Sequence, residues 1–354
     1  MEISRRSALA GLAALASAPA AAETSSPAPA YIAALKDRQG FAAVLLDAAG
    51  EAIARADLPA RGHGAAVSRQ AGLALVFARR PGGYALVFDL ASRRPAGMFA
   101  PPAERRFNGH GAFSADGRLL YASENDFEAA RGAIGVYDVA GGWRRIGEFP
   151  SHGVGPHELL RLEDGHTLVV ANGGIATHPD LPRVKLNLAD MQPSLAYIDS
   201  RNGELLDRAD LPSGYHQLSI RHLVQTARDE VWWSGQYEGP AEDTPPLVGV
   251  HRRGGPIDLL GASADVALRN YAGAIAFNGR SGHAAVSSPR GGRAQIYDVQ
   301  SRRLIETRLI GDVCGLAPRA MDFLASDGHG RLHDGARTVR EAAGVAWDNH
   351  LVRV

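Results

Sequence analysis

The sequence predicts an all-β protein, a seven-bladed β-propeller of four-stranded blades whose last blade is closed by both termini. Two observations carry this prediction. Turn residues are abundant, with 41 Gly and 20 Pro among 354 residues, and long helical patterns are few. Short apolar strands also recur in similar groups of four, at a period of roughly 45–60 residues that is typical of propeller blades.

The first residues predict an export signal. Ser4–Leu9 (SRRSAL) matches a twin-arginine motif and is followed by an apolar run and the small residues Ala20–Ala22. The apolar run is too short for a stable membrane anchor. We therefore expect a signal peptide over 1–22, a linker over 23–30, a periplasmic propeller over 31–354, and no membrane span after processing.

Each predicted blade starts with a hairpin of two strands and continues with a second pair. The hairpins are His63–Arg79, His110–Asn125, His157–Asn172, His222–Gln236 and Gly273–Arg290. The second pairs, in which an apolar strand ends in Asp before a turn, include Phe41–Pro59, Tyr84–Pro101, Gly132–Pro150, Leu195–Pro212 and Ala294–Ile310.

The two ends of the chain predict how the ring closes. The pair Phe41–Pro59 has no first strand before it, and the segment 347–354 (WDNHLVRV) has no partner strands after it. We expect these parts to form one blade, with the C-terminal strand innermost and Tyr31–Asp37 as its second strand, which leaves no open sheet edge. Six or eight blades stay open as alternatives, because strand boundaries in a sequence are imprecise.

Histidines recur where the first, innermost strands are expected to begin. Alignment of these starts gives His63, His110, His157, His222, Gly273, Cys314 and His350. Inner strands line the central channel, so these side chains should ring one mouth of it. Imidazoles with a thiol and a carboxylate suit a transition metal, iron or copper ahead of zinc. The predicted metal ligands are His63, His110, Glu124, His157, His222, Cys314 and His350.

Within this ring, three consecutive blades supply the expected core of the site, His110, His157 and His222. Glu124, at the end of a second strand, would add an oxygen ligand or orient an imidazole. Cys314 and His350 are expected across the channel, in a second site or in none. Because only neutral imidazole binds metal, loading should weaken below about pH 6.5.

Other polar residues are expected at the same mouth. Second strands run back to the face where first strands begin, which brings their ends to the funnel; Arg221 stands beside His222. The candidate cofactor-binding residues are Asn172, Arg221, Gln236 and Arg290. Two insertions, Gly173–Pro193 and Tyr237–Pro246, follow second strands on the same face, where binding loops are commonly built.

Several function classes receive little support. The formal net charge is zero, so a general basic field for nucleic acid is absent. Cys314 is the single cysteine, so no internal disulfide can form. No nucleophile elbow, P-loop or dinucleotide fingerprint appears. A purely structural alternative is that the histidines hydrogen-bond within their blades, as in the Gly-His dipeptide of WD-type repeats.

Several long motifs carry a family resemblance. NGHGAFSADGRLLYASEND, IGEFPSHGVGPHEL, TLVVANGGIATHPD and WDNHL occur in this order across the chain. Together they closely resemble the bacterial domain-of-unknown-function family 1513. The resemblance implies a periplasmic propeller encoded beside imelysin-like iron-regulated proteins and di-haem oxidoreductases, and hence a link with iron acquisition.

The first interpretation is thus a non-catalytic, monomeric periplasmic propeller that binds a transition metal, or a metal-bearing partner, at a histidine-lined mouth. One alternative is a metal-dependent periplasmic enzyme, an oxidoreductase or a lactonase-like protein, at the same funnel. The other is a docking scaffold for proteins that holds no metal.

Overall fold

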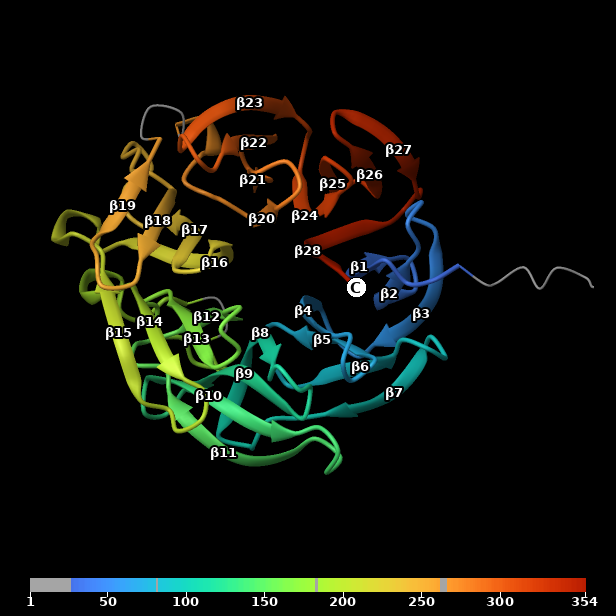
Figure 1. The fold of residues 1–354 in the computed structure, drawn as a ribbon, viewed down its shortest axis with the longest axis horizontal. Coiled ribbons are helices and arrows are strands. Elements are labelled where there is room, and N and C mark those ends of the chain that lie inside the picture. The colour runs from blue at the N-terminus through green and yellow to red at the C-terminus, as the bar shows by residue number, and fades with distance from the viewer. Residues whose placement is uncertain (1–26, 81, 182–183, 262–265) are drawn as a thin grey trace, which may run out of the picture.

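A computed structural model describes residues 27–80, 82–181, 184–261 and 266–354. Seven four-stranded antiparallel sheets follow one another around a ring (Figure 1). The fold class predicted from the sequence, including the number of blades, is confirmed. The predicted signal peptide, residues 1–22, and the first part of the predicted linker lie outside the described residues.

The closing blade combines the two ends of the described chain. Its strand order from the inside outwards is β28 (Ala346–Arg353), β1 (Tyr31–Asp37), β2 (Gly40–Leu46) and β3 (Ala52–Leu58). In the antiparallel register of β28 and β1, Tyr31 stands opposite Arg353. The predicted closure, with the C-terminal strand innermost, is confirmed.

In the other six blades the strands follow chain order from the inside outwards. The first three of these blades are β4 (Gly62–Ser68), β5 (Leu73–Ala78), β6 (Ala85–Asp89), β7 (Arg94–Phe99); β8 (Arg105–Phe113), β9 (Leu119–Asp126), β10 (Arg131–Asp138), β11 (Arg144–Pro150); and β12 (Pro156–Arg161), β13 (Thr167–Asn172), β14 (Ser194–Asp199), β15 (Leu205–Asp210). The last three are β16 (Leu218–Ala227), β17 (Glu230–Tyr237), β18 (Val248–Arg252), β19 (Ile257–Leu260); β20 (Ala274–Asn278), β21 (His283–Ser288), β22 (Arg293–Asp298), β23 (Arg303–Leu309); and β24 (Val313–Arg319), β25 (Asp322–Asp327), β26 (Arg331–Asp334), β27 (Arg337–Glu341).

The two middle strands of a blade are apolar on both faces because neighbouring blades cover both. Every residue of β13 is buried, whereas the outermost strand β7 is exposed almost throughout. Tight turns join the strands, as at Asp164, whose carboxylate accepts hydrogen bonds from the backbone N–H groups of His166 and Thr167. The core therefore lies in the spaces between blades, where Trp232 and Trp233 are fully buried.

The inner strands carry β-bulges where the sequence has its histidines. Gly62 pairs with Ala78 and Ala65 with Val76, so β4 holds one more residue than β5 across the position of His63. Register shifts also occur at or next to the equivalent residues of five other inner strands: His110, His157, His222, Cys314 and His350. The blade without such a residue, that of β20, keeps a continuous register. A bulge re-aims a side chain, and here it accompanies each member of the ring.

These histidines are not the first residues of their strands, as the alignment had assumed. β8 begins at Arg105 and β16 at Leu218, in both cases several residues before the histidine. The extra residues pair with the second strand beyond the bulge. The prediction that each histidine opens its strand is therefore wrong in these blades, although the equivalence of the positions holds.

The two predicted insertions occupy the β13–β14 and β17–β18 connections. The first contains the short 3-10 helix η1 (Leu188–Asp190) and a bridge between His178 and Leu181. Two more single-turn helices, η2 (Ser213–Tyr215) and η3 (Val266–Leu268), precede inner strands. In the described parts of the chain, no helix is long and apolar enough to cross a lipid bilayer.

Candidate functional site

Five histidines from five consecutive blades meet at the centre of the ring. The ring centroid of His110 lies 5.1 Å from that of His63 and 5.0 Å from that of His157. It lies 5.4 Å from the centroid of His222 and 4.7 Å from that of His350. We call these five residues the histidine cluster. All five are at most 9% exposed.

The five imidazole rings lie closer together than the sequence had indicated. The imidazoles of His222 and His350 are 4.7 Å apart, centroid to centroid, although at least two blades separate their strands around the ring. His350 was expected across the channel, too far to share an ion with His110. That expectation is wrong, because the bulged strands bring side chains from opposite sides of the ring into contact.

Two carboxylates from the inner strands hold three of the imidazoles from behind. Oδ1 of Asp348 lies 2.8 Å from Nδ1 of His63. Oε2 of Glu158 lies 3.0 Å from Nδ1 of His222, and Oε1 of Glu158 is 3.7 Å from Nδ1 of His110. A carboxylate at Nδ1 keeps the proton there and leaves the lone pair of Nε2 free for a metal.

Within the histidine cluster, three Nε2 atoms are buried without any hydrogen-bond partner among the described residues: those of His63, His110 and His350. An unsatisfied buried polar atom costs about 1–3 kcal/mol. The same three residues form a group whose candidate ligand atoms all lie within 4.8 Å of one another. When two ring nitrogens bind one metal ion, each lies about 2.0–2.1 Å from the ion, and the two nitrogens lie about 3–4 Å from each other. A small inward shift of the rings would therefore suffice to bind an ion.

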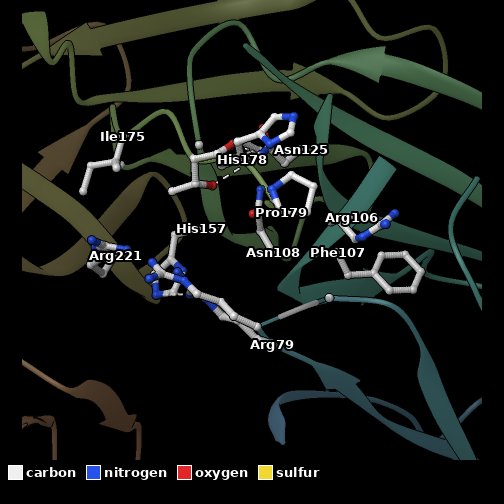
Figure 2. Close-up of a pocket in the computed structure, with 16 residues that line it drawn as sticks. Arg79, Arg106, Phe107, Asn108, Asn125, His157, Ile175, His178, Pro179 and Arg221 are labelled. Atoms are coloured by element: carbon white, nitrogen blue, oxygen red, sulfur yellow. Dashed lines mark hydrogen bonds between the residues drawn. The ribbon is translucent and has the colours of Figure 1, made fainter. Parts of the chain in front are cut away.

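A second group of three, His110, His157 and His222, is the one expected from the sequence. In this group Arg79 competes for the ring of His157: its Nη1 contacts Nδ1 and lies 3.1 Å from Nε2. Figure 2 shows Arg79 reaching to that imidazole, with Arg221 on its other side. A guanidinium occupies the lone pairs and repels a cation, so this group fits a metal less well than the first.

All five imidazoles are neutral at pH 7. Burial lowers the pKa of four of them well below 6.5, helped by the charges of Arg79 or Arg221 nearby: His63, His110, His157 and His222. Burial also lowers the pKa of His350, to about 3. The lone pairs are thus available well below pH 6.5, the value at which loading was expected to weaken.

Glu124 and Cys314 do not reach the cluster. Glu124 is fully buried between strands, where it accepts hydrogen bonds from Tyr137 Oη at 2.5 Å and Arg145 Nη2 at 2.8 Å. The Cys314 thiol lies 3.4 Å from the carbonyl oxygen of Ser326 in an apolar environment, and burial raises its pKa to about 12. Within the described residues, neither belongs to a group of three potential ligands.

A cavity of about 550 Å³ opens over the cluster and contains three of the four predicted cofactor-binding residues, Arg221, Gln236 and Arg290. His63, His157 and His222 also line it. Asn172 is elsewhere: its Nδ2 donates to the carbonyl oxygen of Ser151 at 2.9 Å and ties a loop to β13. Both insertions border the cavity, through Lys185 and through Tyr237 and Glu238.

Sequence reasoning missed Asp348 and Glu158 as orienting carboxylates. A usable signal was present, since Glu158 directly follows His157 and Asp348 stands two residues before His350. A bulge lets successive residues of one strand face the same side. Strict alternation would place Glu158 on the face opposite His157, so it hid Glu158 but not Asp348.

The structural alternative for the histidines, a hydrogen bond within the blade, is not what these contacts show. Asp348 on β28 holds His63 on β4, and Glu158 on β12 holds His222 on β16. Each contact joins two neighbouring blades.

The family model described as "Protein of unknown function (DUF1513)" matches residues 56–354. The chain belongs to the DUF1513 family. The predicted resemblance is confirmed, and the matched region of this DUF1513 protein contains the whole histidine cluster with both carboxylates. No curated protein matches the chain.

Among solved structures, the DUF1513 chain is similar to hydrazine synthase from Kuenenia stuttgartiensis. The TM-score is 0.62 at 14% sequence identity, over 88% of this chain and 96% of the other. At this identity the similarity shows the fold alone.

Proposed function

We propose that this DUF1513 protein binds a transition-metal ion through the Nε2 atoms of His63, His110 and His350. The observation that carries the proposal is that these three imidazoles can each offer a ring nitrogen within 4.8 Å of the other two, while their buried Nε2 atoms have no hydrogen-bond partner among the described residues. Buried polar atoms in native proteins are almost always satisfied. An ion at their centre would satisfy all three.

The surrounding residues support this geometry. Asp348 orients His63, and Glu158 stands behind His110, as carboxylates do behind metal-bound imidazoles. The negative charge of Asp348 also favours a cation. Arg79 contacts the ring of His157 directly, which disfavours an ion in the second group more than in the first.

The donor set favours copper among the expected metals. Three neutral imidazoles without a carboxylate differ from the two-histidine, one-carboxylate set typical of non-haem iron. Affinity for nitrogen ligands peaks at copper in the divalent series. Iron, which the family resemblance had suggested, and zinc, which three-histidine sites also bind, are the alternatives.

The test compares three proteins produced in a host that exports them: the wild type, His63→Ala/His350→Ala, and the control His166→Ala, whose side chain is 43% exposed. Elemental analysis should find close to one equivalent of metal in the wild type and the control, and none in the double variant. Circular dichroism should show that all three are folded. A double variant with full metal content, or a wild type that takes up neither copper, iron nor zinc, would refute the proposal.

One observation favours the alternative of a metal-dependent enzyme: the cavity over the cluster is large enough for a small substrate to reach the ion. An enzyme would keep its ion through dialysis and use it in turnover, whereas a carrier would exchange it. Retention of the ion against a strong chelator for hours, together with oxidation of a small reductant by the loaded protein, would favour the enzyme.

We also propose that the protein acts in the periplasm after twin-arginine export. The motif at Ser4–Leu9 supports this. Changing Arg5 and Arg6 to Lys should leave unprocessed protein in the cytoplasm, and normal delivery of that variant would contradict the assignment. A link with iron acquisition, the imelysin-like and di-haem oxidoreductase partners, and a monomeric state stay predictions.

A further inference from the structure

The cavity over the histidine cluster is strongly cationic. Its lining includes six basic side chains and one acidic one, Glu238; the basic ones are Arg61, Arg79, Arg80, Lys185, Arg221 and Arg290. Tyr271, Asn270, Asn349 and Gln236 add hydrogen-bonding groups. A volume of about 550 Å³ is typical of a site for a small molecule. The charges of the residues that line the cavity indicate the charge of that molecule.

Glu238 offsets only part of this charge. Its two carboxylate oxygens are shared between Lys185 and Arg221, the latter at 3.3 Å. Arg221 is 6% exposed, and its Nε has no hydrogen-bond partner among the described residues. A buried guanidinium with an unused donor is costly unless a ligand completes it.

Arg79 is partly exposed and lines the same cavity. In the described part of the chain no carboxylate forms an ion pair with it, and its contact is the ring of His157. Burial and repulsion from Arg221, Arg80 and Arg61 lower the pKa of Arg79 well below its usual value. Positively charged side chains held this close together indicate a site for a negatively charged ligand.

At the rim, Arg290 is held in position by an aromatic ring. Its guanidinium carbon stands 4.6 Å from the centroid of Tyr271, a cation–π contact that leaves the planar fork able to donate. Arg290 thus lines the cavity together with Arg79 and Arg221 as a third guanidinium.

We propose that this cavity binds a small polyanion, with at least two carboxylate or phosphate groups, through Arg79, Arg221 and Arg290. Arginine forks bind both kinds of group with paired hydrogen bonds. This site goes beyond the proposed metal site, and the polyanion binds to metal-free protein as well. With His63, His157 and His222 in its wall, a bound polyanion would also lie beside the ion.

The test is calorimetric titration of metal-free protein at low and at physiological salt. The probes are citrate, succinate, inorganic phosphate and pyrophosphate, with glycerol as the neutral control. At least one polyanion should bind saturably at one site, more weakly as salt rises, and glycerol should not bind. Strongest binding by citrate would identify a polycarboxylate, and strongest binding by pyrophosphate a phosphate ligand.

Variants locate the site. Arg290→Gln should weaken binding by about tenfold, the effect of losing one charge-assisted hydrogen bond. The matched control Arg303→Gln removes an exposed arginine on the outer strand β23 and should change nothing. Arg221→Lys, which keeps the charge but loses the fork, should also bind more weakly.

The His63→Ala/His350→Ala variant separates the two proposals. It should lose metal and keep polyanion binding, so the failure of one proposal leaves the other testable. If no polyanion binds the wild type, or if Arg290→Gln and Arg221→Lys both bind like the wild type, the polyanion site is overturned.

Discussion

Oδ1 of Asp348 and Nδ1 of His63 lie 2.8 Å apart, although 285 positions separate the two residues in the sequence. The contact joins β28 to β4, the inner strands of the closing blade and of its neighbour. Asp348 also accepts from Arg61 Nε. One carboxylate therefore couples closure of the ring to the orientation of His63, a proposed metal ligand.

Replacing this carboxylate should weaken metal binding while the fold is kept. In Asp348→Ala, His63 loses the partner that fixes its tautomer, and affinity should fall by about 10–100-fold. Competition with a chromophoric chelator measures the affinity. The control Asp57→Ala removes a carboxylate that is 78% exposed on β3. Equal affinities in the two variants would mean that Asp348 has no part in the site.

Crowding at Gly109 offers a second test of how the cluster is packed. Gly109 has φ +99°, and a Cβ placed there would stand 2.8 Å from Cδ2 of His63. Gly109→Ala should lower both stability and metal affinity. The control Gly40→Ala has a similar backbone cost at φ +125° but open space around the new Cβ. A drop in metal affinity confined to Gly109→Ala would show that displacement of His63 is the cause; equal affinities would contradict it.

Removing the inner strand of the closing blade should destroy the fold. Deletion of residues 347–354 exposes the edge of β1, and domains of this kind are stable by only about 5–15 kcal/mol. The truncated protein should aggregate, whereas the point variant His350→Ala should stay folded. An unchanged melting temperature after truncation would contradict the observed pairing.

The metal-free protein should be sensitive to acid. The five cluster histidines have folded pKa values below their unfolded value of about 6.5, so the unfolded state binds more protons and stability falls as pH drops below 6.5. Burial raises the pKa of Glu158 to about 7, which acts in the opposite direction. Unfolding therefore takes up about four protons net, because five histidines gain a proton and Glu158 releases one. At about 1.4 kcal/mol per proton and pH unit, the free energy of unfolding should fall by up to about 5 kcal/mol per pH unit.

Urea denaturation at pH 7.5, 6.5 and 5.5 measures this slope. The other charged groups that face the cluster are Asp348, Arg61, Arg79 and Arg221. A denaturation midpoint that stays constant from pH 7.5 to 5.5 would show that the imidazoles are accessible to protons in the folded state.

The Cys314 thiol should be inert in the folded protein. It is 3% exposed, and a pKa near 12 leaves almost no thiolate at pH 8. Ellman's reagent should react with one thiol in guanidinium chloride and with none in buffer. Cys314→Ala should keep the full metal content. Loss of metal in Cys314→Ala would show that the Cys314 thiol is a metal ligand.

The sequence was sufficient for the fold because each blade repeats its own local signals. Turn residues, apolar strands and the unmatched segments Phe41–Pro59 and 347–354 predicted seven blades, with six or eight as alternatives, and the closure that the structure confirms. The equivalence of the histidines was also visible. The bulges that aim them were not, since a bulge depends on the pairing of two strands, and the distance from His222 to His350 depends on the width of the whole ring.

The two residues predicted as ligands that lie elsewhere, Glu124 and Cys314, show what a repeat alignment cannot distinguish. Glu124 stands opposite Phe107, before the bulge of β8, and its side chain is held by Tyr137 and Arg145. Cys314 sits in a bulge like the histidines, yet its short side chain ends among backbone carbonyls. Residues at equivalent positions of a repeat can therefore differ in whether their side chains extend to the histidine cluster.

Because β28 supplies both Asp348 and His350, the order of synthesis matters for the cluster. The other four histidines of the cluster precede β28 in the sequence, so they are synthesised before it. The group that best fits an ion needs a strand that is translated after all of these. A chain interrupted anywhere before β28 would therefore present imidazoles to the cell without the geometry to retain a metal, so that metal retention would distinguish completed chains from fragments.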